Sequence, residues 1–141
     1  MTTSAVPTWK LTSPTALLSW VLAALILFLS ARALLDPVSA ADGFGLPVTS
    51  ADALPWLRIK AGRDLGIGLM LLVVLLQRER RVFGAISLVS VVMPLVDCLT
   101  VIGRGVRPVG YALGVHGSAV VYGLLLGAAL LWPRRSPSPS P

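Results

Sequence analysis

The sequence contains one cysteine, no asparagine and few charged residues, and each shortage excludes a class of protein. The single cysteine, Cys98, can form neither an internal disulfide nor a multi-cysteine metal site. Without asparagine there is no N-glycosylation sequon. Charged residues make up 13% of the chain, against about a quarter in ordinary soluble domains. The chain is therefore not an ordinary soluble domain.

Apolar sequence takes the place of charge: 55% of the 141 residues are hydrophobic, and they gather in long runs. Most of these runs approach the ~20 residues needed to cross the hydrocarbon core of a bilayer. We therefore predict an all-α, integral membrane four-helix bundle with up-down-up-down topology. Its predicted spans are residues 15–35, 55–77, 82–102 and 109–132, between a flexible N-terminus at 1–14 and a disordered Pro/Ser tail at 133–141.

Two of these spans need a closer argument. The apolar run of the second begins only near Gly62, but Pro55 fits a first helical turn behind Ser50 or Asp52 as the N-cap, which starts the helix earlier.

For the first span, the alternative to a membrane helix is a cleaved signal peptide. Its apolar run exceeds the ~7–15 residues of a signal-peptide core, so we favour a retained helix.

The positions of the basic residues indicate how the predicted spans are oriented across the membrane. With four spans, both termini and the central loop share one side, which carries Lys10, Arg78, Arg80, Arg81, Arg134 and Arg135. The positive-inside rule therefore predicts cytoplasmic N- and C-termini, in a membrane that the sequence does not identify. These flanking arginines also explain the formal net charge of +6. We expect the lipid bilayer as a partner and no nucleic acid.

Glycine spacing predicts close contacts between helices, because small residues let neighbouring backbones approach. Two four-residue spacings lie in the fourth span and three further glycines lie in the second: Gly110, Gly114, Gly123, Gly127, Gly62, Gly66 and Gly68. We expect these residues to pack the bundle internally. A homo-oligomer formed through the same glycine faces is the alternative.

Ionisable residues within apolar spans are costly and mark functional-site candidates. Antiparallel spans bring four of them, one from each span, to similar depth at the non-cytoplasmic end: Arg32, Asp64, Asp97 and His116. Two carboxylates and a histidine supply the donor and acceptor that acid-base chemistry needs. Asp64, Asp97 and His116 are therefore the candidate catalytic residues.

The pocket predicted around these residues has further features. Pro94, one turn before Asp97, removes a backbone hydrogen bond to Ser90 and predicts a kink in the third span. Such a kink exposes polar backbone that an interior cavity tolerates and lipid does not. The candidate ligand-binding residues are Arg32, Arg63 and Tyr111.

Two alternatives explain the same polar residues without a ligand pocket. Arg32 paired with Asp64 or Asp97 would form a buried ion-pair network that fixes helix register. A metal site would use His116 and the aspartates, but no helix carries two ligands at a suitable spacing, so we predict neither metal nor cofactor. Phosphate-binding loops and dinucleotide fingerprints are absent from the sequence.

Several motifs resemble a known family. They are Ala31-Arg32 through Asp36-Pro37, Gly43-Phe44-Gly45-Leu46-Pro47, Lys60-Ala61-Gly62-Arg63-Asp64-Leu65-Gly66-Ile67-Gly68, Asp97 and His116-Gly117. Over residues 28–130 the chain resembles the small four-span membrane proteins grouped as domain of unknown function 4267. The resemblance implies a four-span fold and marks these positions, and it assigns no chemistry to them.

Three function classes follow. The first is an enzyme or binding protein for a lipophilic small molecule, held under the loop from Asp36 to Pro55, with acid-base chemistry at the polar end. The second is a structural or accessory membrane subunit. The third is a small transporter, which needs an ionisable residue reachable from both sides, whereas the cytoplasmic halves of the predicted spans contain none. This distribution favours a dead-end cavity over a channel.

Overall fold

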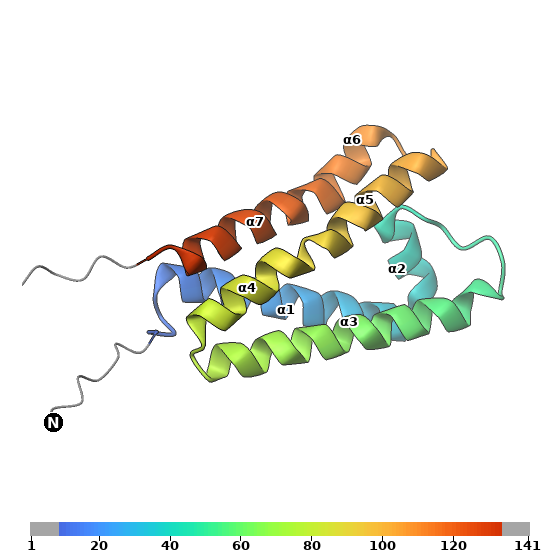
Figure 1. Ribbon diagram of the computed structural model, residues 1–141. Helices are drawn as coiled ribbons and strands as arrows, with labels where there is room; N and C mark the ends of the chain where they lie inside the picture. Colours follow the sequence, from blue (N-terminus) through green and yellow to red (C-terminus); the bar gives the residue numbers. More distant parts are fainter. Residues whose placement is uncertain (1–8, 134–141) are drawn as a thin grey trace, which may run out of the picture.

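The computed structural model describes residues 9–133, and the regular elements in this part are all helical. They are α1 (Pro14–Leu35), α2 (Pro37–Phe44), α3 (Ala53–Leu76), α4 (Arg80–Ser90), α5 (Val92–Arg104), α6 (Val109–Ala112), the π-helix η1 (Leu113–Gly117) and α7 (Ser118–Leu131). Helices α4 and α5 form one rod, and α6, η1 and α7 form another. With α1 and α3 these rods alternate in direction, and α2 lies at one end (Figure 1). The predicted all-α class is confirmed.

Three rods are long and apolar enough to cross a membrane: Pro14–Leu35, Arg80–Arg104 and Val109–Leu131. They match the predicted spans at 15–35, 82–102 and 109–132. Helix α3 has 24 residues, but its first half is more polar because it contains Arg58, Lys60, Arg63 and Asp64. Length and composition therefore indicate a multi-pass membrane protein with three candidate spans.

The two ends of the chain are described only in part. The predicted tail lies outside the described residues after Pro133, as do residues 1–8 of the predicted flexible N-terminus. Trp9, within that N-terminal segment, is 2% exposed. Its ring packs edge-on against Phe83 of α4, with 6.1 Å between centroids, and its Nε1 donates to Thr15 Oγ1 at 3.2 Å. Indole burial with a satisfied N–H fastens this segment to the bundle.

Glycines of α4 and α7 allow these two helices to pack closely. A Cβ added at Gly127 would lie 2.6 Å from Leu88 Cγ and 3.0 Å from the Gly84 carbonyl oxygen, and one at Gly123 would lie 2.8 Å from Val91 Cγ2. In the other tight pair, α1 and α3, a Cβ at Gly68 would lie 2.8 Å from Leu27 Cδ2. The predicted internal packing is confirmed for these glycines.

The other predicted glycines have a different environment. At four of them, an added Cβ would meet no atom of residues 9–133 within 4 Å: Gly62, Gly66, Gly110 and Gly114. These residues lie in the half of the bundle near α2. The glycine stripes therefore divide into an internal set and an open set.

The rod formed by α4 and α5, third along the chain, breaks where Pro94 predicts a kink. Helix α4 ends at Ser90 and α5 begins at Val92, because proline has no N–H to donate to the carbonyl one turn earlier. Before the break α4 packs against α3, whereas within residues 9–133 α5 makes few contacts with it. Helix α2 lies in the space between α3 and α5 (Figure 1).

The α4–α7 contact gives a first test. We expect Gly127→Ala to lower the free energy of unfolding by about 1–3 kcal/mol, because the added methyl overfills the contact with Leu88. Gly66→Ala is the matched control, since its methyl meets none of the described residues within 4 Å and alanine favours the helix. Thermal unfolding of the purified chain in detergent measures both. Equal stability of the two variants would contradict this packing.

Candidate functional site

Helix α2 is the element that sequence analysis missed, since we expected a loop over residues 36–55. Asp36 is its N-cap, and the carboxylate accepts a hydrogen bond from the Ser39 backbone N–H at 3.1 Å. Pro37 occupies its first turn. Gly45 ends it in the left-handed conformation, at φ 101°. An Asp-Pro start and a glycine end are ordinary helix boundaries, so these signals were present in the sequence.

His116 binds the C-terminal end of α2. Its Nε2 lies 2.8 Å from the Phe44 carbonyl oxygen, and the two rings are in contact at a tilt of 59°, with centroids 4.5 Å apart. A carbonyl can only accept a hydrogen bond, so Nε2 carries the proton. His116 belongs to η1 and is 6% exposed; short π-helical segments are frequent at functional sites.

Three further side chains hold α2 in place. The Tyr111 hydroxyl donates to the Gly43 carbonyl at 2.7 Å, and Arg107 forms an ion pair with Asp42. Lys60 Nζ lies 5.1 Å from the centroid of the Phe44 ring, a cation-π distance. Helix α2 is thus docked on α3, on α6 and η1, and on the loop before α6.

The predicted cations do not form ion pairs between spans. Arg32 Nη2 donates to the Ser39 carbonyl at 3.2 Å and to its hydroxyl at 2.9 Å. Arg63 is exposed and has no hydrogen bond or ion pair with any residue of the described range 9–133. Asp64 pairs with Lys60, one turn away on α3, at 2.7 Å. The alternative in which Arg32 pairs with Asp64 or Asp97 is therefore wrong.

Asp97 is half-buried on α5. Its carboxylate makes no hydrogen bond or ion pair with the residues that the structure describes. Lys60, Asp64 and His116 lie close enough for their charges to act on it. The structure therefore brings Asp64 and His116 within electrostatic range of Asp97. Residues 9–133 contain no group of three or more His, Cys, Asp or Glu side chains with metal-binding geometry.

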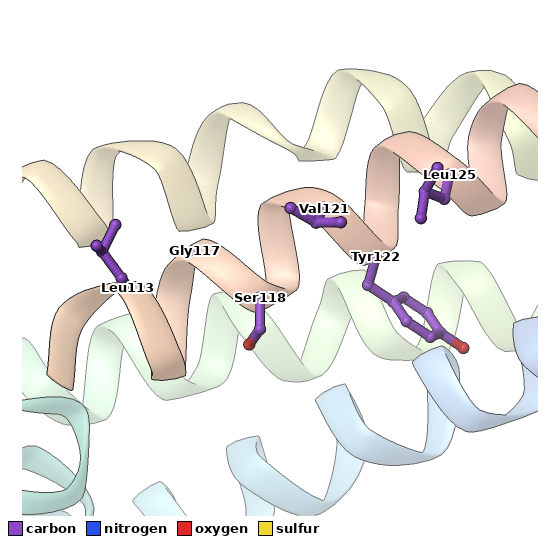
Figure 2. Close-up of a pocket in the computed structure, with 6 residues that line it drawn as sticks. All are labelled: Leu113, Gly117, Ser118, Val121, Tyr122 and Leu125. Carbon is purple, nitrogen blue, oxygen red and sulfur yellow. The ribbon is translucent and has the colours of Figure 1, made fainter. Parts of the chain in front are cut away.

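An apolar groove of about 560 Å³ follows η1 and α7. Figure 2 shows its lining residues: Leu113, Gly117, Ser118, Val121, Tyr122 and Leu125. Its hydroxyls are occupied, because Ser118 donates to the Gly114 carbonyl at 2.7 Å and Tyr122 to the Leu18 carbonyl of α1 at 2.8 Å. The groove thus offers apolar contact beside the segment that carries His116.

A family model described as Domain of unknown function (DUF4267) matches residues 23–130. The chain belongs to the DUF4267 family. This confirms the resemblance seen in the sequence, and the matched region contains α2 and all of the predicted site residues. Among curated proteins and among solved structures, no match is found.

The docking of α2 gives a second test. We expect His116→Ala to loosen residues 36–52, because it removes the hydrogen bond and the ring contact at Phe44, at a cost of about 1–3 kcal/mol. Hydrogen exchange followed by mass spectrometry should show faster exchange in peptides from this segment. Arg63→Ala, an exposed residue of α3, should leave their exchange unchanged. Unchanged protection in His116→Ala would show that this contact does not hold α2.

Proposed function

We propose that the protein has four membrane spans, with α3 as the fourth and both termini on the cytoplasmic side. Helix α3 is long enough for this at 24 residues and packs along α1. Its charges lie in its first half, where Lys60 and Asp64 neutralise each other and Arg58 and Arg63 are exposed. Just after α3 ends, at the end of the bundle opposite α2, Arg80 at the start of α4 donates to the Ala129 carbonyl of α7 at 2.7 Å.

We further propose that this membrane protein binds a lipophilic small molecule whose polar group meets Asp97. One observation carries the proposal: a half-buried carboxylate in an apolar span, without a hydrogen-bond or ion-pair partner among residues 9–133. Placing charge at bilayer depth costs several kcal/mol unless a partner or a wet cavity compensates it. A ligand that supplies a hydrogen-bond donor or a cation provides this compensation.

The surrounding groups suit acid-base chemistry on such a ligand. The carboxylate of Asp97 acts as the proton acceptor or donor, beside the Lys60–Asp64 pair. His116 uses Nε2 to hold Phe44, which leaves Nδ1 as its remaining proton-exchanging atom. The cytoplasmic halves of the predicted spans, 15–35, 55–77, 82–102 and 109–132, contain no Asp, Glu, His, Lys or Arg, so proton-coupled transport through one molecule is disfavoured.

The groove along η1 and α7 supports a lipophilic partner. Its lining is apolar and its hydroxyls are already bonded, so it suits a hydrocarbon chain better than a polar group. Two of its lining residues, Leu113 and Gly117, belong to η1, the segment that also contains His116. We propose that the apolar part of the ligand lies here and is exchanged with the bilayer.

The open glycines favour a second candidate, an accessory subunit that docks on another membrane helix. Gly62 and Gly66 of α3 lie four residues apart with nothing near their Cβ positions, as do Gly110 and Gly114 near the start of the fourth rod. Such spacing allows close helix contact in membranes. The partner in this case is a second copy of the chain or a different protein.

The topology is tested by cysteine accessibility in a Cys98→Ser background. We expect an impermeant maleimide added outside intact cells to label Ala51→Cys, before α3, and not Gln77→Cys, after it. Permeabilised cells should show labelling of both. Labelling of both positions from outside would contradict a crossing by α3.

The proposed site is tested by Asp97→Asn. Because the carboxylate has no protein partner among the described residues, neutralising it should keep the folded state or stabilise it by up to about 3 kcal/mol. The same change should deplete the copurifying lipophilic ligand about tenfold, a loss typical of a charged hydrogen bond. Thermal unfolding and mass spectrometry of bound molecules measure the two effects.

Asp52→Asn is the matched control, since Asp52 is an exposed carboxylate at the same end and makes no side-chain capping bond. It should keep both ligand and stability. A large loss of stability in Asp97→Asn would favour a structural role. Equal amounts of the same molecules bound to wild type and to folded Asp97→Asn protein would contradict the proposed site.

A further inference from the structure

A separate pocket of about 290 Å³ lies where the loop after α2 meets the C-terminal end of α5. Its lining residues are Leu46, Pro47, Thr49, Thr100, Arg104 and Val106. Pockets that enclose a whole drug-sized ligand measure about 300–1,000 Å³. This pocket is therefore suited to one chemical group of a larger molecule.

The walls of this pocket are fixed by packing. Gly45 has φ 101°, and a Cβ there would lie 3.0 Å from Val101 Cγ1 and 3.2 Å from Tyr111 Cε1. Only glycine combines this backbone conformation with such a close approach to α5. The next residue, Leu46, packs on the buried cluster of Cys98, Val101 and Ala112. The loop is thereby held against α5 on one side of the pocket.

Arg104 gives the pocket a cation that has no partner in the part of the chain that the structure describes. It is exposed and has no hydrogen bond or ion pair within residues 9–133, whereas nearby Arg107 is paired with Asp42. Thr100 donates its hydroxyl to the Val96 carbonyl at 2.7 Å. The Thr49 hydroxyl donates to no described residue, so it is available as a second donor. The remaining lining is mainly apolar.

A cation in the last turn of a helix also complements the helix dipole. That effect accounts for a basic residue at the end of α5 and does not account for a pocket around it. The candidate span Arg80–Arg104 ends at this residue, which places the guanidinium at the level of the lipid head groups. Arginine matches phosphate oxygens with two parallel N–H donors.

We propose that this pocket binds the phosphate of an anionic membrane-lipid head group, with Arg104 as the cation and Thr49 as a hydroxyl donor. Leu46, Pro47 and Val106 contact the apolar atoms next to the phosphate. Because the pocket is separate from Asp97, this site holds whether or not Asp97 binds a ligand.

The test uses the full chain in a neutral detergent, titrated with phosphatidylglycerol and followed by native mass spectrometry. We expect Arg104→Gln to weaken binding about tenfold or more, the loss typical of a hydrogen bond to a charged group. Arg58→Gln is the matched control, because it removes the same charge from an exposed position in the first half of α3. It should change the affinity by less than about twofold.

A third variant and a soluble competitor complete the experiment. Arg104→Lys keeps the charge but loses the forked geometry, so we expect an intermediate affinity. Inorganic phosphate should fail to displace the lipid, and displacement by it at equal concentration would identify a soluble anion as the occupant and overturn the proposal. Equal losses in Arg104→Gln and Arg58→Gln, or full affinity in folded Arg104→Gln protein, would also overturn it.

Discussion

The missing N–H of Pro94 is the constraint on which the polar end of this molecule depends. Because Pro94 cannot bond to the carbonyl of Ser90, the third rod divides into α4 and α5. Helix α4 remains tightly packed on α7 through glycines, while α5 departs from α3. The space that results is occupied by α2. Asp97, one turn after the proline, lies on the α5 side of this space.

Insertion of α2 creates a second requirement, because the last carbonyls of a helix lack internal partners. Where a helix end is packed against other helices and water has little access, protein donors must satisfy these carbonyls. Tyr111 and His116 supply these donors to the carbonyls of Gly43 and Phe44. His116 is therefore engaged in holding α2, which sets its Nε2 tautomer and orients Nδ1. The histidine combines a structural role with its proposed chemical one.

Sequence could predict those features that depend on local composition. Apolar length located three candidate spans, and Pro94 located the break. The residues that each polar side chain contacts could not be predicted in this way. Arg32 reaches Ser39 rather than a carboxylate, because α2 is an eight-residue helix too short to give a periodic signal. Likewise, glycine spacing alone did not distinguish the internal glycines from the open ones, since that depends on which face meets a neighbour.

The two aspartates show why similar depth does not imply a similar role. Asp64 has Lys60 four residues earlier on the same helix, so its charge is compensated wherever α3 lies. Asp97 has Met93 and Pro94 on one side and Thr100 and Val101 on the other, none of which carries a charge. Its compensation must come from other helices or from a ligand, and within residues 9–133 no other helix forms an ion pair with it. The same reasoning separates Arg107, which has Asp42, from Arg104. For Asp97, which lies within an apolar span, a carboxylate without a partner among residues 9–133 is most simply explained by a partner outside the chain.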